Sequence, residues 1–322
     1  MNNNPGQNLD KPKPKPTRVD PHVLDTYIEG IQHLPPTPTL MLQLIELFRK
    51  PDVDADEIVA LLGRDPALAV EVLRRCNSAY YGLDTPVMDI NEAVFRMGFY
   101  EVYQMAVALS GMRALTPGEK VPGFSAETLQ RHSNITAIAA GALALEADQS
   151  EGIAFTAGLL HDVGKLVLAL GERDKYVTVM ENCRSSGASL NETEKMIFGF
   201  NHDEVGARLL QRWGVPVEVV MPALGHNDPA PTGEWHQVVA ITNLASRMAN
   251  YIEQAVGQSC RSAQVTERQI MAGQEKEKTP GPTPFVQLPG VKPLTDFLKL
   301  KDTQVIQWEQ VVRAKVEQLA AN

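Results

Sequence analysis

Apolar residues recur at helical spacing along most of the chain, and this periodicity restricts the fold more than any other feature. Similar patterns run from residue 21 to about residue 255, and no segment shows sustained alternation with β-branched residues. One example near the N-terminus places its apolar residues three and four apart: Leu40, Leu44, Ile45, Leu47 and Phe48. The sequence therefore predicts an all-α fold.

Acidic residues mark several helix starts. Asp54 is followed by Glu57, and Asp65 is followed directly by Pro66. A carboxylate before the first turn accepts hydrogen bonds from free backbone amides, and proline is well placed at the first helical position. The apolar pattern predicts further helices over residues 101–115, 126–147, 151–170, 174–186, 191–198, 203–213, 217–224 and 234–255.

The composition changes near both ends of the predicted domain, which we place at residues 22–256. Residues 1–21 are Asn-rich and then alternate Lys and Pro, which predicts a disordered leader. Residues 257–290 are polar and rich in Gln, Glu, Lys, Gly and Pro, which predicts a flexible insertion. Residues 291–322 contain an amphipathic helix with Trp308 on its apolar stripe. We expect this helix to dock on the domain, and the alternative is that it forms a homodimer.

Charge and cysteine content restrict the partners and the compartment. The formal net charge is −9, and an acidic surface repels phosphate backbones, so we expect no nucleic-acid partner. Three cysteines without paired spacing suit a reducing compartment. No stretch approaches about 20 uninterrupted apolar residues, and the N-terminus has no apolar segment of a secretory signal. These features predict a cytoplasmic protein without a membrane partner.

The sharpest local feature is the segment His161-Asp162-Val163-Gly164-Lys165 within an apolar stretch. Burial of an ionisable pair costs free energy unless the pair is satisfied by partners or by a metal. His161 and Asp162 can offer a nitrogen and an oxygen to one divalent ion, and Lys165, one turn later, can face an anionic ligand such as phosphate. The alternative is a buried polar pair that only fixes helix packing.

Three further histidines stand at suitable places. His132 lies on the preceding predicted helix, while His202 begins and His226 ends later ones. Helical bundles gather metal ligands from separate helices, although spacing alone does not show that these residues converge. Mixed nitrogen and oxygen ligands suit Mn, Fe, Zn or Ni. The predicted metal ligands are His132, His161, Asp162, His202 and His226.

Three ordered motifs resemble those of the bacterial HDOD family. The first runs from Asp65-Pro66-Ala67-Leu68 to Tyr81-Gly82, the second from Gly158 to Lys165, and the third from His202 to Pro216. The resemblance covers roughly residues 34–251. It implies an HD-domain-like helical bundle with an additional N-terminal helical subdomain, related to HD-type phosphohydrolases. It also implies a signalling output module whose catalytic ligands are incomplete or unused.

The resemblance also suggests what is missing. By position, the five predicted ligands are similar to those of the related enzymes, but the final Asp of those enzymes is replaced by Asn243 or Ser246. The Gly-Tyr-Pro signature of the relatives that cleave cyclic di-GMP is absent, because Asn227-Asp228-Pro229 follows His226. Asp228 remains as a candidate substitute ligand.

Two functional hypotheses follow. The first is a bacterial regulatory module without catalysis that acts through a signalling protein partner or a small phosphorylated ligand. The alternative is a metal-dependent phosphohydrolase for nucleotides or cyclic dinucleotides, in which Lys165 would neutralise transition-state charge. The lost carboxylate favours the first hypothesis, because a site is read from its residues rather than from its fold.

Overall fold

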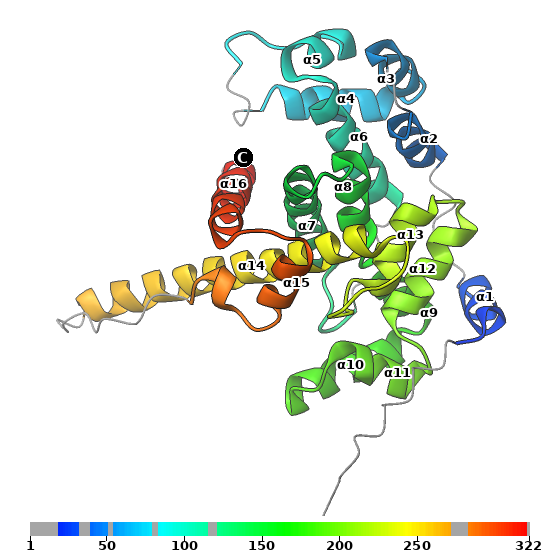
Figure 1. Ribbon diagram of the computed structural model, residues 1–322, viewed down its shortest axis with the longest axis vertical. Coiled ribbons are helices and arrows are strands. Elements are labelled where there is room, and N and C mark those ends of the chain that lie inside the picture. The colour runs from blue at the N-terminus through cyan, green and yellow to red at the C-terminus, as the bar shows by residue number, and fades with distance from the viewer. Residues whose placement is uncertain are drawn as a thin grey trace, which may run out of the picture.

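The computed structural model describes residues 19–31, 39–50, 54–78, 83–114, 121–271 and 283–320. These segments are almost entirely helical, and the β pairing found within them is one isolated bridge between Val121 and Phe124 (Figure 1). The predicted all-α fold is confirmed. The predicted leader falls outside the described residues except for residues 19–21, and the first helix begins at Pro21.

The helices are, in chain order, α1 (Pro21–Glu29), α2 (Thr39–Phe48), α3 (Ala55–Leu62), α4 (Pro66–Cys76), α5 (Ile90–Met97), α6 (Phe99–Ala114), α7 (Ala126–Glu146), α8 (Glu151–Leu160), α9 (Val163–Gly171), α10 (Arg173–Ser186), α11 (Leu190–Phe198), α12 (His202–Arg212), α13 (Val217–Gly225), α14 (His236–Met271), η1 (Phe285–Gln287), α15 (Val291–Phe297) and α16 (Asp302–Ala320).

The first group of helices, α2 to α5, packs around α6 at the top of Figure 1. Two predicted helix starts are confirmed here. Asp54 accepts a hydrogen bond from a backbone amide in the first turn of α3, and Asp65 caps α4 by accepting one from the amide of Leu68. Helix α6 carries this subdomain onto the rest of the molecule through its packing against α8.

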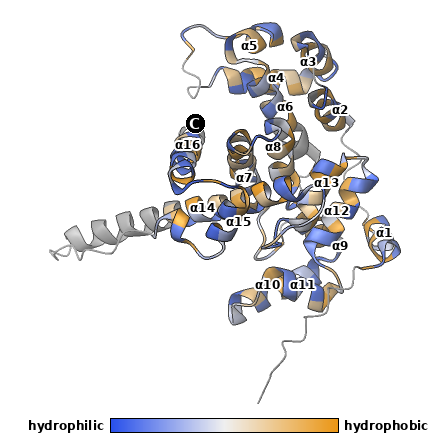
Figure 2. Ribbon diagram, in the orientation of Figure 1, coloured by the Kyte–Doolittle hydropathy of each residue, from blue (hydrophilic) through white to orange (hydrophobic). Residues whose placement is uncertain are grey.

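The central bundle holds most of the buried apolar surface. Helix α7 packs along α8 and α14, and α12 packs against both α9 and α13. Figure 2 shows apolar residues where these helices face one another. The core of the bundle includes Leu143, Leu160, Leu168 and Leu209, none of which is more than 1% exposed.

The predicted helix over 151–170 is wrong in one respect, because it is divided into α8 and α9 by a turn at His161 and Asp162. Within the described residues, Glu151–Gly171 is the stretch whose length and composition would suit a membrane span, but 83% of its apolar window is buried inside the protein. Both helices are buried on nearly every side, so the apolar pattern runs across the turn without a break. At this turn the side chains of His161 and Asp162 can contact residues of other helices.

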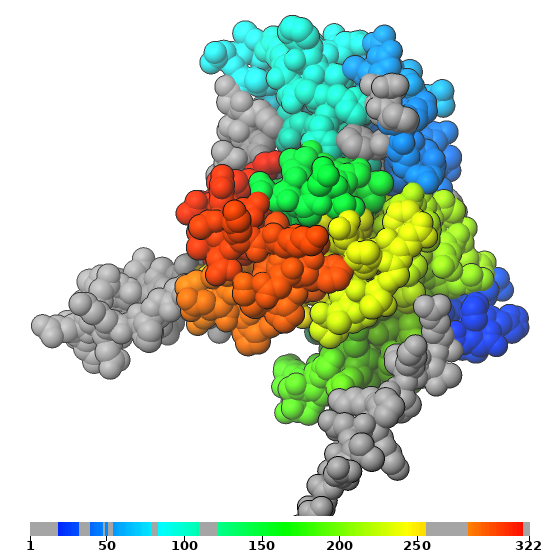
Figure 3. All heavy atoms as spheres, in the orientation of Figure 1, coloured from blue at the N-terminus to red at the C-terminus, as the bar shows by residue number. Residues whose placement is uncertain are grey.

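The C-terminal part differs from the predicted boundaries. Helix α14 continues to Met271, so the expected domain end at residue 256 falls inside a helix. Gln, Glu and Lys are good helix formers, and a polar composition does not by itself end a helix. The amphipathic helix expected within residues 291–322 is α16, and a further short helix, α15, precedes it. Trp308 of α16 is buried, and its indole N–H donates a 2.9 Å hydrogen bond to the carbonyl of Ala139 on α7. Figure 3 shows the orange and red C-terminal segment lying against the green central part of the molecule.

Candidate metal centre

The structure brings the five predicted ligand residues together in the middle of the bundle. His132 comes from α7, and His161 and Asp162 from the turn between α8 and α9. His202 is the first residue of α12, and His226 caps the C-terminal end of α13. All five are buried, from 0% exposure for His161 to 8% for His132.

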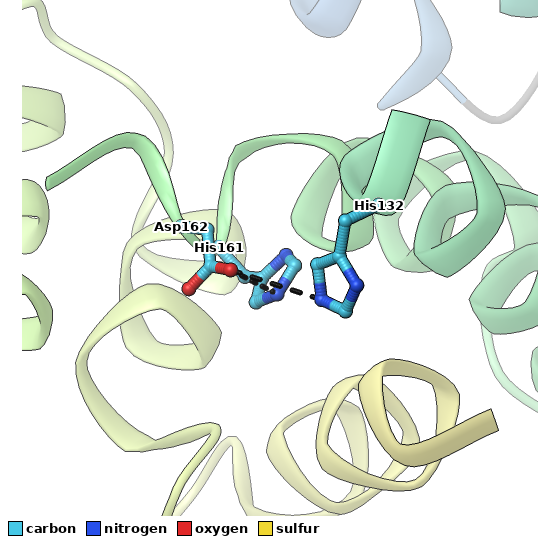
Figure 4. A group of neighbouring side chains, drawn as sticks. All are labelled: His132, His161 and Asp162. Atoms are coloured by element: carbon cyan, nitrogen blue, oxygen red, sulfur yellow. Dashed lines mark ion pairs between the residues drawn. The ribbon is translucent and has the colours of Figure 1, made fainter. Parts of the chain in front are cut away.

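Two groups of three ligands share one carboxylate. In the first triad, Oδ2 of Asp162 lies 3.3 Å from Nε2 of His161 and 3.7 Å from Nε2 of His132 (Figure 4). In the second triad, Oδ1 of Asp162 lies 3.4 Å from Nε2 of His226 and 3.5 Å from Nε2 of His202. Within each triad all ligand atoms lie within 4.8 Å of one another.

Backbone carbonyls orient two of the rings. Nδ1 of His161 lies 2.7 Å from the carbonyl oxygen of Gly158, and Nδ1 of His226 lies 3.1 Å from that of Ala223. A carbonyl can only accept, so Nδ1 carries the proton and Nε2 presents a lone pair towards Asp162. Each histidine contacts the carbonyl three residues before it, at the end of its own helix.

Two glutamates orient the other rings, and sequence reasoning missed both. Nδ1 of His202 lies 2.6 Å from Oε2 of Glu194, and Nδ1 of His132 lies 3.2 Å from Oε2 of Glu253. A carboxylate behind a histidine holds the ring and raises its basicity as a metal ligand. Glu194 is fully buried on α11, but a glutamate in a polar helical segment gives no sequence signal of this burial.

Three buried polar atoms of this cluster have no hydrogen-bond partner among the described residues. They are Nε2 of His161, Oδ1 of Asp162 and Nε2 of His202. A buried polar group without a partner costs about 1–3 kcal/mol, so such atoms require an explanation. A divalent cation bound between imidazole nitrogens and carboxylate oxygens would satisfy them, and the donor set therefore fits a metal ion.

The protonation states suit metal binding in part. Burial lowers the pKa of His161 to about 4, so this ring is neutral at pH 7. Burial alone would raise the pKa of Asp162, but the neighbouring His161 and Lys165 hold it well below its usual range. Because His161 is neutral, the positive charges beside this carboxylate at pH 7 are those of Lys165 and His202. Burial would lower the pKa of His202 too, but the carboxylates of Asp203 and Glu194 raise it to about 9, so a cation must displace a proton there.

Lys165 and Ser246 face the first triad. Nζ of Lys165 lies 2.5 Å from Oδ2 of Asp162, and the Lys165 side chain is 22% exposed. Oγ of Ser246 lies 3.3 Å from Nε2 of His132, so this hydroxyl faces the first triad. Asn243, the other candidate, instead donates to the backbone carbonyl of Asp228.

Asp228 does not join the centre. Its Oδ1 accepts a hydrogen bond from the backbone amide of Ala230 in an exposed turn. The suggestion that Asp228 substitutes for the missing ligand is therefore not supported by the contacts of its carboxylate.

A cavity of about 940 Å³ opens onto the cluster. Its walls come from the start of α7, from α10, from the start of α11 and from α14. Lys165 and Ser246 reach the cavity from the metal-centre side, and Phe124, Leu129 and Met180 form an apolar wall. The volume is that of a small-molecule site.

A model of the HDOD domain matches residues 34–229, which is more than half of the chain. The chain belongs to the HDOD family. The structure of an HDOD domain protein of unknown function from Geobacter sulfurreducens is 21% identical, covers 93% of this chain and 97% of its own, and superposes with a TM-score of 0.68.

A candidate signal transduction protein from Marinobacter aquaeolei VT8 has the same TM-score at 22% identity, over 93% of the HDOD chain and 64% of its own. An uncharacterised protein of Treponema pallidum (strain Nichols) is 26% identical over 229 residues, which is 70% of this chain but 44% of that protein. The HDOD chain thus spans less than half the length of that relative. At these identities the solved structures show a shared fold.

Proposed function

We propose that this HDOD chain is a non-catalytic bacterial signalling module that binds a small phosphorylated ligand in the cavity over the metal centre. One observation carries the proposal: Ser246, a neutral hydroxyl, faces His132 where a hydrolase would hold its closing carboxylate. Hydrolysis of a phosphoester needs a metal that is held firmly while an open position carries water. A neutral oxygen holds the metal less firmly than a carboxylate does and positions the water less well.

Lys165 weakens the first triad further. Its ammonium contacts the same oxygen of Asp162 that His132 and His161 face, and so neutralises the one anionic ligand of that triad. A cation there would compete with this ammonium. Loss of turnover with retention of a binding pocket is the expected consequence.

The cavity favours a ligand with an anionic end and an apolar or planar end. The ammonium of Lys165 can pair with a phosphate, and the half-buried side chains of Phe124, Leu129 and Met180 can cover the other end. We expect a bound ligand to alter the affinity for a signalling protein partner. The acidic charge and the cysteine content support a cytoplasmic location without nucleic-acid or membrane partners.

The metal that we propose is Mn, Fe, Zn or Ni. The cluster offers imidazole nitrogens and carboxylate oxygens but no thiolate, a donor set that suits these first-row ions. Elemental analysis of protein purified without chelator identifies which of them is present.

Loss of the Lys165 charge should weaken ligand binding. With AMP as the probe, we expect Lys165→Ala to reduce affinity at least about tenfold, because one charge-assisted hydrogen bond contributes roughly 1.5–3 kcal/mol. Isothermal titration measures the affinity, and Lys175→Ala, on the exposed side of α10, is the control. Neither protein should hydrolyse nucleotides, cyclic dinucleotides or generic phosphoesters with added Mn²⁺. Turnover that disappears in His161→Ala would contradict the proposal and favour an enzyme.

The alternative function, a metal-dependent phosphohydrolase, is favoured by one observation. Asp162 presents one oxygen to each triad, as expected of a carboxylate between two cations.

Substitution Ser246→Asp tests how much the first triad lacks. The new carboxylate would face His132, so we expect the variant to bind a divalent cation at this triad at least about tenfold more tightly than the wild type. Asn243→Asp is the matched control, because Asn243 is bonded away from the centre and should change little. Equal metal binding by Ser246→Asp and wild type would show that this position does not reach the cation.

A further inference from the structure

A second His-Asp pair, His202-Asp203, stands beside the metal ligands, and the expected ligand set did not include its carboxylate. We infer that the most tightly held cation of this chain lies in the second triad, with Asp203 as an additional anionic ligand beside His202, His226 and Asp162. This inference rests on the proposed metal centre. It goes further by assigning which of the two triads binds a cation first.

The distances among these four residues support a single ion. Oδ1 of Asp203 lies 3.0 Å from Nε2 of His202 and 3.6 Å from Nε2 of His226. Oδ1 of Asp162 lies 3.5 and 3.4 Å from the same two nitrogens. Ligands at about 2.1 Å from one cation in tetrahedral geometry lie about 3.4 Å apart. All four separations are compatible with neighbouring ligands of one ion. The group whose ligand atoms all lie within 4.8 Å of one another is Asp162, His202 and His226, and Asp203 adds its contacts to the two imidazoles.

Two of the inferred ligand atoms in the second triad accept or donate no hydrogen bond within the described residues. Nε2 of His202 forms an ion pair with Asp203 at 3.0 Å but has no hydrogen-bond partner among the described residues. Oδ1 of Asp162, which faces the same place, has none either. Both residues are at least 98% buried. A cation between these two atoms would satisfy both.

Three asparagine amides hold the Asp203 carboxylate in place. Oδ2 accepts hydrogen bonds from the side-chain amides of Asn191 at 2.7 Å and Asn201 at 3.1 Å. Oδ1 accepts from the amide of Asn227 at 3.0 Å. Donors on every side favour the ionised carboxylate, and ligating carboxylates are commonly fixed in this way. Asp203 is thus built as a positioned anion.

The side-chain amide of Asn227 lies between His226 and Asp203, at the place inferred for the cation. Its nitrogen lies 2.9 Å from Nε2 of His226 while it donates to Oδ1 of Asp203. The electropositive N–H groups therefore sit between two of the inferred ligand atoms. A cation that used Nε2 of His226 would displace this amide.

The two triads differ in charge. The second has two carboxylate oxygens, one from Asp162 and one from Asp203, and Lys165 contacts neither oxygen. In the first, the one carboxylate oxygen is already paired with the Lys165 ammonium, and Ser246 supplies only a hydroxyl. Cation affinity rises with the number of anionic ligands, so the second triad should fill first.

Titration with Co²⁺ tests this order on the full chain, because its visible absorption reports coordination and isothermal titration gives affinity and stoichiometry. We expect Asp203→Asn to weaken the tightest site at least about 100-fold. His132→Ala, in the first triad, should change it less than about threefold. Glu204→Gln is a control for loss of a neighbouring carboxylate, since Glu204 contacts Asn201 and Lys195 rather than the imidazoles.

The opposite pattern, loss of the tight site in His132→Ala and retention in Asp203→Asn, would overturn the inference and leave a metal centre in the first triad. If circular dichroism shows that Asp203→Asn does not fold, the same comparison is made between His226→Ala in the second triad and His132→Ala in the first. Absence of Co²⁺ binding by the wild type would refute the metal centre and this inference together. Binding of AMP, measured separately through Lys165, decides the signalling proposal in that case.

Discussion

Substitution Gly164→Ala should lower the stability of the protein by at least about 3 kcal/mol, at or beyond the upper end for overpacked sites. A Cβ on Gly164 would lie 1.9 Å from the carbonyl oxygen of His202 and 2.8 Å from the amide nitrogen of Gly206. Both neighbours are backbone atoms of α12, so no side chain can turn away to make room. The helices α9 and α12 would have to separate, and their packing is part of the buried core.

Thermal unfolding checks this expectation, with a decrease in Tm of about 6 °C or more. Gly30→Ala is the matched control, because its Cβ would lie 3.4 Å from the nearest atom and its backbone is right-handed. An unchanged Tm for Gly164→Ala would mean that α9 and α12 do not cross at this distance. Substitution Gly206→Ala, with a Cβ 2.9 Å from the amide nitrogen of Gly164, tests the same crossing from the other helix.

This crossing also sets the geometry of the metal centre. Gly164 lies two residues after Asp162, and Gly206 lies four residues after His202. The closeness of the two helices therefore determines how near Asp162 comes to His202. A glycine in the segment His161-Asp162-Val163-Gly164-Lys165 is visible in the sequence, but its partner on another helix is not.

The sequence predicts most of the helices and selects five residues that the fold brings together, because each leaves a local signal. Apolar periodicity predicts α7, α12 and α13, and a histidine in an apolar context indicates a buried polar site. The division between α8 and α9 leaves no such signal. Neither proline nor a run of polar residues marks the turn at His161, and both flanking helices are buried all round.

The residues that support the ligands could not be predicted in the same way. Folding brings the side chains of Asp203, Glu194 and Glu253 to the histidines from other parts of the chain. Aspartate and glutamate are also common on exposed helix surfaces, so the sequence alone does not single these three out. The continuation of α14 to Met271 was missed for a related reason. A polar composition predicts exposure to water, and whether an exposed segment is helical depends on propensity and length.

Substitution Asp162→Asn should remove metal binding from both triads, with a loss in affinity of at least about 1,000-fold, greater than the 10–100-fold typical of a residue that supports a ligand. Each oxygen of Asp162 faces two imidazole nitrogens, so this one carboxylate contacts all four rings. The amide keeps the size of the side chain but provides one neutral oxygen in place of two anionic ones. Lys165, which is 22% exposed, can turn towards water, so the fold should survive.

Metal-dependent stabilisation gives a direct measurement of this loss. A ligand at 100 times its Kd stabilises the folded state by about 2.7 kcal/mol, which raises the Tm of the wild type in a titration with Co²⁺. Asp162→Asn should show no such increase and should retain no metal in elemental analysis. Glu192→Gln, which changes an exposed carboxylate at the rim of the same cavity, should behave as the wild type does. Retention of the full metal content by Asp162→Asn would place the cation outside both triads, because any ion bound within either one has an Asp162 oxygen among its ligands.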